Sequence, residues 1–215
     1  RFSDTNLPPR LLPFPPWRGG SLHGHTILVY AEQGVGDEIM FASCLPDLIK
    51  MGGRCIVECD PRLVRLFSRS FPDAHFVAAS DMNDGEWLPK PSPIDLQVAA
   101  GDLPSHFRRQ LGDFPHHVGY LQADPSRVEY WRAKLSALGP GLKIGISWRG
   151  GLKLSRAHLR SIPLDQLLPV LHQEGVHFIN LQYGPCSEEM NSIQRQAGIS
   201  IHHWAEAHTD FDEMA

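Results

Sequence analysis

Several features that would mark a specialised protein are missing from this sequence of 215 residues. No apolar run approaches the ~18 residues that a membrane-spanning helix requires. The start carries no basic segment followed by an apolar one, as a secretory signal would. The formal net charge is only -4, and Lys and Arg are scattered along the chain. We therefore expect neither an integral membrane protein nor a partner of nucleic acid or of anionic membrane surfaces.

The four cysteines lack the C-x-x-C spacing of redox and metal motifs. Three of them fall in apolar segments, where a free thiol behaves as a small hydrophobic group. We expect reduced thiols and a cytoplasmic location. The twelve histidines include the pairs His116-His117 and His202-His203 but no H-E-x-x-H arrangement, which predicts that no metal is bound.

What the first part of the sequence does contain is an alternation of short apolar runs and helical patterns. The opening stretch 7–20 is too rich in Pro and Gly for a helix or a central strand, so it predicts an extended lead-in. Short continuous apolar runs are typical of strands buried on both faces. The predicted strands are 25–31, 53–60, 74–79 and 94–100, with helices at 38–51 and 61–72 and a polar loop at 80–93.

The second part repeats this alternation after a helix at 124–138, which Asp124 caps and Pro125 begins. Strands that alternate with helices imply parallel sheets, which bind ligands at the carboxyl ends of their strands. We predict an α/β protein with two Rossmann-like domains, 1–140 and 141–215, facing a cleft, the second one truncated. The predicted strands here are 142–148, 176–182 and 199–204, with helices at 163–175 and 187–198 and the first turn of another at 210–215.

The loop Gly34-Val35-Gly36-Asp37 follows the first predicted strand and feeds a helix, whose N-terminus favours anions. The dinucleotide fingerprint G-x-G-x-x-G fails because Ile39 replaces the third glycine, and a Walker loop is absent. A structural explanation stays open, in which the glycines make a tight turn and Asp37 caps the helix. A carboxylate repels phosphate, so a catalytic or acceptor-facing role suits Asp37 better than a phosphate loop does.

The ribose-binding acid that a dinucleotide site requires at the end of the second strand is offered only by Glu58 or Asp60. The broken fingerprint therefore disfavours a nicotinamide oxidoreductase. No G-x-S-x-G elbow occurs, which argues against an α/β-hydrolase.

A second loop, after the strand at 142–148, gathers cationic side chains around a Gly-Gly turn, ahead of a predicted helix. Guanidinium groups and a helix N-terminus together suit a diphosphate. The alternative is a solvated loop whose charges face water. A third loop, "NLQYGP", ends another predicted strand, where Gln182 and backbone groups could meet a ligand. The cationic residues of the second loop are Arg149, Lys153, Arg156, His158 and Arg160.

These segments together resemble a known family. "AEQGVGDEIMFASCLPDL", "GYLQADPSRVEYWRAKL", "GISWRGG", "RSIPLDQLLPVL" and "GVHFINLQYGP" are similar in order and spacing to bacterial proteins related to glycosyltransferase family 9. That family includes the ADP-heptose:lipopolysaccharide heptosyltransferases and a branch found behind tetratricopeptide repeats. The resemblance covers nearly the whole chain and implies the GT-B fold, with the acceptor mainly on the first Rossmann-like domain and the nucleotide sugar mainly on the second.

The resemblance also implies roles for individual residues. Asp37 matches the candidate general base, in a loop with Gln33, Gly34 and Gly36. Arg160 stands where the heptosyltransferases carry a lysine that stabilises the donor diphosphate. The implied reaction is an inverting, metal-independent transfer without a cofactor, from a nucleotide-diphosphate sugar to a glycan or protein acceptor. The helix starting near Pro163 joins the diphosphate side, as do Ser147, Arg149 and Lys153, while Gln182 and Tyr183 lie on the nucleotide side.

Two alternatives remain. One is a catalytically inactive module of the same fold that serves binding or scaffolding, and the other is a nucleotide-sugar epimerase. The relatives continue past this point with a D-T-x-x-x-H-like motif that grips the nucleotide. We therefore expect a fragment of a longer protein, with weak or absent catalysis on its own.

Overall fold

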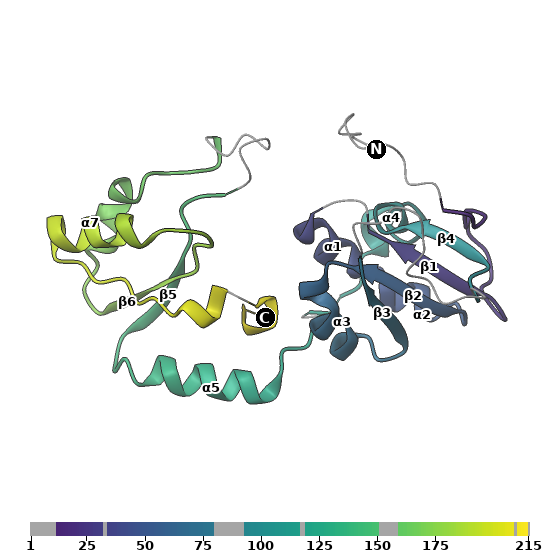
Figure 1. Cartoon of the computed structure of the whole chain (residues 1–215), viewed down its shortest axis with the longest axis horizontal. Coiled ribbons are helices and arrows are strands. Elements are labelled where there is room, and N and C mark those ends of the chain that lie inside the picture. The colour runs from purple at the N-terminus through teal and green to yellow at the C-terminus, as the bar shows by residue number, and fades with distance from the viewer. Residues whose placement is uncertain are drawn as a thin grey trace. The chain divides into compact units, whose positions relative to one another are not determined.

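The computed structural model describes residues 12–31, 34–79, 93–116, 119–150, 159–208 and 210–214 (Figure 1). The chain divides into two compact units, residues 1–122 and 123–215. Each unit has its own sheet of parallel strands. The mixed α/β class with parallel strands that the alternation predicted is thus confirmed.

The first unit is built on a four-stranded sheet in the order β3-β2-β1-β4, with all strands parallel (Figure 1). Val29 of β1 pairs with Val57 of β2 on one side and with Val98 of β4 on the other. β1 is central and almost wholly buried, which explains its unbroken apolar sequence. This arrangement is Rossmann-like. The strands are β1 (Thr26–Tyr30), β2 (Arg54–Cys59), β3 (Ala74–Ala78) and β4 (Leu96–Ala99).

The lead-in is extended along the outer edge of β4 in its described part. The backbone N-H of Trp17 donates to the Gln97 carbonyl at 2.7 Å, and the Gln97 N-H donates to the Pro15 carbonyl at 3.0 Å. The Gln97 amide also donates to the carbonyls of Leu12 and Phe14. These bonds satisfy backbone groups of β4 that an edge strand would otherwise expose.

The helices of the first unit are short, and the single helix expected at 38–51 is split into α1 and α2. The break falls at Ser43-Cys44, and Pro46 lies in the first turn of α2. The guanidinium of Arg108 donates to the Ser43 carbonyl at 3.0 Å and to the Asp47 carboxylate at 2.7 Å. Arg108 thus ties the end of α1 to the start of α2. The helices are α1 (Val35–Ala42), α2 (Leu45–Ile49), η1 (Pro61–Leu63), α3 (Val64–Ser70), η2 (Ala100–Asp102), α4 (Leu103–Phe107) and η3 (Leu111–Asp113).

The second unit has a two-stranded parallel sheet of β5 and β6. The third strand expected at 199–204 is reduced to one bridge, in which the Asn180 N-H donates to the His202 carbonyl and the His202 N-H to the Phe178 carbonyl, both at 2.8 Å. The elements are α5 (Pro125–Ser136), β5 (Leu142–Ile146), η6 (Leu164–Leu167), α6 (Leu168–Leu171), β6 (Val176–Asn180), α7 (Ser187–Ala197), η7 (Ala205–His208) and α8 (Phe211–Met214).

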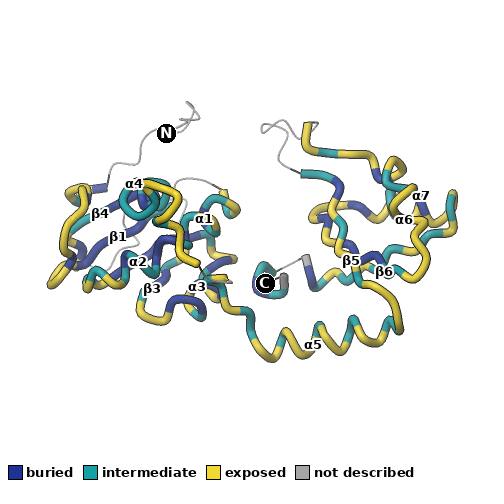
Figure 2. The backbone as a smooth tube through the Cα atoms, turned by 180° about the vertical axis from the view of Figure 1, so that it is seen from behind, coloured by how far each residue is buried: buried dark blue, intermediate teal, exposed yellow. Residues whose placement is uncertain are grey.

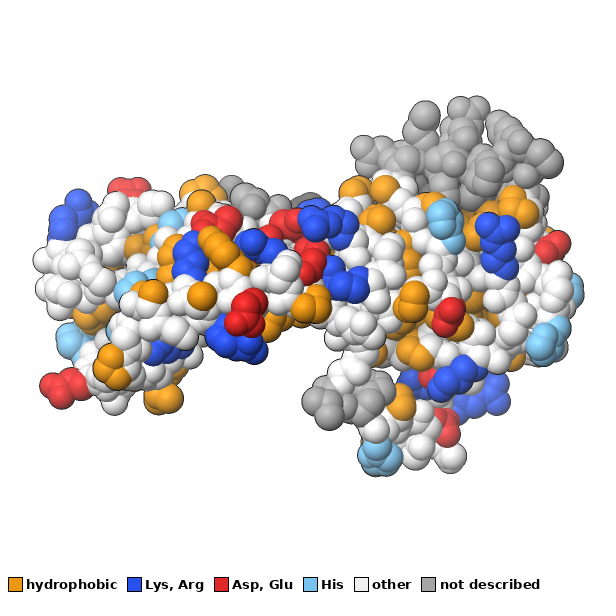
Figure 3. All heavy atoms as spheres, turned by 90° about the horizontal axis from the view of Figure 1, so that it is seen from below, with side chains coloured by type: hydrophobic (Ala, Val, Ile, Leu, Met, Phe, Trp, Pro, Cys, Tyr) orange, Lys and Arg blue, Asp and Glu red, His pale blue; other side chains and the backbone are white. Residues whose placement is uncertain are grey.

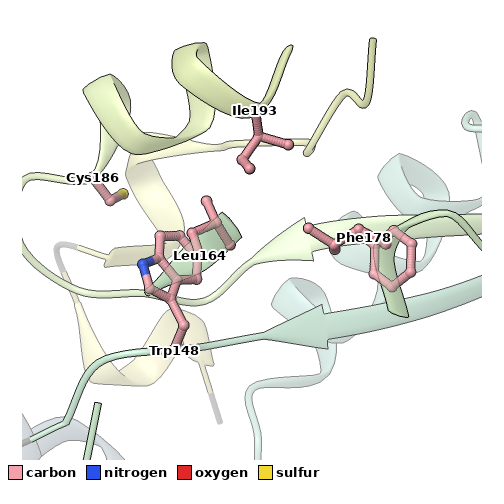
Figure 4. Close-up of a cluster of buried hydrophobic side chains, with 6 residues drawn as sticks. Trp148, Leu164, Phe178, Cys186 and Ile193 are labelled. Carbon is pink, nitrogen blue, oxygen red and sulfur yellow. The ribbon is translucent and has the colours of Figure 1, made fainter. Parts of the chain in front are cut away.

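Six buried side chains form the core of the second unit. Figure 4 shows the Trp148 indole between the strand end and α7, with Leu164 beside it and Ile193 reaching down from α7. Trp148 lies two residues beyond the end of β5, so this core also anchors the start of the cationic loop. The six residues are Trp148, Leu164, Leu171, Phe178, Cys186 and Ile193.

Helix α5 starts as predicted, because the Asp124 carboxylate accepts the Ser126 N-H at 2.8 Å and Pro125 is the first helical residue. None of its residues is buried (Figure 2). Its contacts are with the C-terminal segment: Trp131 packs on Trp204 and donates to Glu213. The division at 122/123 therefore falls before α5, whereas the sequence pattern placed the boundary near 140.

All four cysteines are free, as the sequence predicted, and all four are buried, whereas the sequence placed only three of them in apolar segments. Burial raises the pKa of the Cys55 thiol to about 11 and that of Cys59 to about 12. These thiols are therefore poor nucleophiles. No helix in the described ranges is long and apolar enough to cross a bilayer.

Arg108→Ala should lower the free energy of unfolding by about 2 to 3 kcal/mol, because it leaves the Asp47 carboxylate and the Ser43 carbonyl without their donor. The value lies at the low end for a buried pair, since the Asp47 side chain is 30% exposed. Urea denaturation of the whole chain measures the change.

Arg109→Ala is the matched control. Among the described residues, its exposed side chain donates to the Ser105 carbonyl alone, so the expected loss is below about 0.5 kcal/mol. Equal losses for the two variants would contradict the role of Arg108.

Candidate functional site

The glycine loop lies where open parallel sheets bind ligands. β1 lies between β2 and β4, so the strands that follow β1 along the chain are added first on one side and then on the other. The carboxyl ends of β1 and β4 therefore meet at the topological switch point, the usual ligand site of such sheets. α1 begins there and contacts η2, which follows β4.

The two described glycines of this loop are not required by a tight turn. Gly34 is the N-cap of α1 with φ -76° and ψ 165°, and neither Gly34 nor Gly36 has a positive φ. A Cβ at Gly36 would meet nothing within 4 Å, and one at Gly34 would meet only the Asp37 carboxylate, at 3.9 Å. Glycine inside a helix costs about 0.5–1 kcal/mol relative to alanine. What it provides here is bare, exposed backbone that a ligand can approach closely.

Asp37 is the third residue of α1, so it is not the helix cap that one interpretation of the sequence made it. The N-cap is Gly34, which has no side chain to accept a hydrogen bond. The Asp37 side chain is half-buried, and its carboxylate makes no hydrogen bond or ion pair to any described residue. An acceptor group in the first turn of a helix, at a switch point, is suitably placed for a substrate hydroxyl. Gln33 lies outside the described residues.

Glu38, the next residue, was missed by the sequence analysis. Its side chain is buried and accepts the Asp60 N-H at 2.8 Å. Burial is the main cause that raises its pKa, with the nearby Asp60 and Glu58 carboxylates adding to the effect and the Asp60 N-H opposing it. The signal in the sequence was its spacing of four from Ala42, which is buried on the same face of α1.

The acids at the end of β2, Glu58 within the strand and Asp60 just after it, are not arranged to bind a ribose. Arg62 holds Asp60 through two side-chain bonds of 2.9 and 2.8 Å, and this contact lowers the pKa of Asp60. Glu58 is only 2% exposed. The geometry therefore agrees with the broken fingerprint in disfavouring a dinucleotide site.

In the second unit, a hollow of about 460 Å³ opens where the chain leaves β5. Its described lining brings together three of the predicted diphosphate ligands, two of them arginines, and includes no acidic residue. Such a lining favours an anion. On the face shown in Figure 3, by contrast, Lys and Arg are interspersed with Asp and Glu. The hollow is lined by Ser147, Trp148, Arg149, Gly150, Leu159, Arg160, Ser161, Ile162 and Leu167.

Arg160 lies on the returning arm of this loop. The Ile162 N-H donates to the Trp148 carbonyl at 2.8 Å, and the Gly150 N-H donates to the Ser161 hydroxyl at 3.4 Å. These bonds bring the exposed Arg160 beside the strand end. Ser161 joins the site here, although the sequence analysis did not name it. Lys153, Arg156 and His158 lie outside the described residues.

Arg149 is held by the protein itself. Its Nη2 donates to the Pro185 carbonyl at 2.7 Å and lies 3.1 Å from the Glu189 carboxylate. Glu189 also accepts the Trp148 indole N-H at 3.2 Å. The Arg149 Nε is buried and has no hydrogen-bond partner among the described residues. Arg149 is thus held in a fixed position in the lining of the hollow and is paired with Glu189, while Arg160 is the more exposed of the two.

The two residues expected on the nucleotide side, Gln182 and Tyr183, differ in how far they are exposed. Tyr183 is 54% exposed, whereas Gln182 is 2% exposed and its amide is bonded to protein groups. Ser147 donates its hydroxyl to Gln182 at 3.2 Å, so that proton is not directed at a phosphate.

The helix expected from Pro163 is much shorter than the sequence pattern indicated. Pro163 is the N-cap of the four-residue 3-10 helix η6, and α6 adds a single turn. Asp165 stands in the first turn of η6. A helix this short, with an acid at its start, adds little to the binding of a diphosphate. The cationic side chains remain the main anion-binding groups.

Among the residues that the structure describes, no group of three or more His, Cys, Asp or Glu side chains is placed to hold a metal ion. The candidate groups are therefore an acceptor-type carboxylate in the first unit and an anion hollow in the second.

Comparison with known proteins gives one curated relative. The chain is 36% identical over 214 residues to Protein FlbA of Caulobacter vibrioides (strain ATCC 19089 / CIP 103742 / CB 15), a match that covers 94% of this chain and 36% of FlbA. The chain thus spans about a third of the length of that protein. No family model and no solved structure matches the chain.

The buried Glu38 predicts a defined pH dependence of stability. Because its pKa is raised above the ordinary value of 4.5, the folded chain binds this proton more tightly than the unfolded chain does. The stabilising contribution is complete below pH 4.5 and is lost as the pH rises through the folded-state pKa. Glu38→Gln keeps an acceptor for the Asp60 N-H without the charge. The Tm of the variant minus the Tm of the wild type should therefore become more positive as the pH rises from 4 to 8.

Glu188→Gln, an exposed residue in the first turn of α7, is the control and should show no such trend. Thermal denaturation across the pH range provides the measurement. A Glu38→Gln difference that stays flat or falls with pH would contradict the assignment.

Proposed function

We propose that this chain is part of a glycosyltransferase that moves a sugar from a nucleotide-diphosphate donor to an acceptor hydroxyl. Three lines support the proposal: the family 9 resemblance over nearly the whole chain, the parallel sheets, and the chemistry of the two loops. The second unit binds the donor and the first unit binds the acceptor, a glycan or a protein side chain. FlbA lends no activity to this proposal, since its name states none.

The observation that carries the proposal is the hollow after β5. Its described lining includes Arg149, Arg160 and Ser161 and no acidic residue, although Glu189 pairs with Arg149 from α7. A diphosphate is a multiply charged group, and planar guanidinium donors match its oxygens. The sequence alone left open a solvated loop whose cations face water independently of one another. Their convergence on one hollow favours a shared anion.

The proposed chemistry is a single displacement without a metal. The acceptor oxygen attacks the anomeric carbon as the bond from that carbon to the diphosphate oxygen breaks, and the bonding electron pair leaves with the diphosphate. Asp37 accepts the proton of the acceptor hydroxyl. Arg160, together with Arg149, stabilises the negative charge that develops on the leaving diphosphate.

Arg160→Ala should weaken the binding of a nucleoside-diphosphate sugar at least about tenfold, since charge-assisted hydrogen bonds contribute about 1.5–3 kcal/mol. Arg160→Lys should recover part of the loss. Calorimetry with a panel of nucleotide sugars measures both. Arg195→Ala, at an exposed arginine in the last turn of α7, is the control that should bind as the wild type does. Equal affinity of Arg160→Ala and wild type would refute the donor site.

Asp37→Asn should reduce sugar transfer about a hundredfold or more while donor affinity stays unchanged, because the amide cannot accept the hydroxyl proton. Transfer is assayed in the longer protein that includes this segment. Unchanged turnover would exclude Asp37 as the base. Donor binding by a wild type that shows neither transfer nor donor hydrolysis would instead support the non-catalytic binding module.

A further inference from the structure

Gln182 makes an unusual set of hydrogen bonds two residues beyond the end of β6. Its side-chain oxygen accepts the Ser147 hydroxyl at 3.2 Å, the Trp148 N-H at 3.0 Å and the Arg149 N-H at 2.7 Å. All three donors belong to consecutive residues that leave β5 and line the anion hollow. One buried oxygen therefore fixes the direction of the chain where the hollow begins.

Gln182 is itself held in place by neighbours on its own loop. Its backbone N-H donates to the Asn180 side-chain oxygen at 2.8 Å, and its amide nitrogen donates to the Tyr183 carbonyl at 3.0 Å. Asn180 is 1% exposed and donates to Cys186 Sγ at 3.2 Å and to His203 Nδ1 at 2.8 Å. A buried polar network in which each of these groups is paired is rigid.

The amide suits this position better than other side chains would. Three donors require an acceptor oxygen, and the Tyr183 carbonyl requires a donor, so an amide of this length meets both needs. A glutamate would keep the acceptor but add a negative charge beside the hollow. A hydrocarbon side chain would leave the Trp148 and Arg149 N-H groups without their hydrogen-bond acceptor.

We infer that Gln182 is a positioning residue of the proposed donor site. It does not touch the donor; it holds the Ser147 hydroxyl and the backbone of Trp148 and Arg149 in place where these residues line the hollow, while Glu189 holds the Arg149 guanidinium at its far end. This inference rests on the proposed function, since the occupant is the donor diphosphate. It replaces the expectation that Gln182 meets the nucleotide directly.

The test combines backbone amide exchange with pyrophosphate binding, both on the whole chain. In Gln182→Met the amides of Trp148 and Arg149 should exchange at least tenfold faster, and the Kd for pyrophosphate should rise about tenfold. Gln182→Glu retains the acceptor and should restore slow exchange at both amides. If Gln182 contributed only to general stability, amide exchange would become faster throughout β5 and β6. The positioning role predicts faster exchange at Trp148 and Arg149 without that general increase.

Gln196→Met, on the exposed face of α7, is the matched control and should change neither readout.

Should Gln182→Met fail to fold, Gln182→Asn replaces it, because its amide is one methylene too short to reach the loop. Unchanged exchange at Trp148 and Arg149, or faster exchange with unchanged pyrophosphate affinity, would overturn the inference. If the wild type binds no pyrophosphate, the proposed function fails, whereas the amide exchange still reports separately on the hold that Gln182 has on the loop.

Discussion

Parallel strand pairing is the constraint on which the rest of the structure depends. Parallel neighbours cannot be joined by a hairpin, so the chain crosses back over the sheet between strands, and all the strands end at one edge. Val29 pairs with Val57 in the first sheet, and Ile144 pairs with Phe178 in the second. The loops after β1 and β5, the first strands of their sheets, consequently open at carboxyl ends, where parallel sheets bind ligands.

These two loops have equivalent positions but opposite chemistry. The loop after β1 presents bare glycine backbone and the Asp37 carboxylate, whereas the hollow after β5 is lined by arginines and no acid. A carboxylate repels phosphate and a guanidinium binds it, so the two loops suit different substrates. A transferase that must hold a hydroxyl acceptor and a diphosphate donor uses both kinds of loop.

The strands of both sheets and the starts of α5 and α7 could be predicted because their signals are local, whereas the strand expected at 199–204 forms only one bridge. Continuous apolar runs mark buried strands, and Asp124 with Pro125 marks the start of α5. For the split between α1 and α2 the sequence offered only Pro46, which interrupts the helical pattern; the bonds that fix the split come from Arg108, 61 to 65 residues away in sequence. The direction of the Gln182 side chain depends in the same way on a partner loop 33 to 35 residues earlier. Asp37 and Arg160 could be named from the sequence. The contacts that hold Arg149 and those that Gln182 makes join segments far apart in sequence, so no local pattern indicates them.

The proposed function depends above all on the binding of a nucleoside diphosphate by the second unit at the hollow after β5. Chemical-shift mapping of the labelled chain during titration with a nucleoside diphosphate measures this binding residue by residue. We expect saturable shifts at Gly150, Arg160 and Ser161, with the amides of Gly34 to Asp37 unmoved. Shifts confined to the glycine loop, or none at millimolar ligand, would contradict the proposed function.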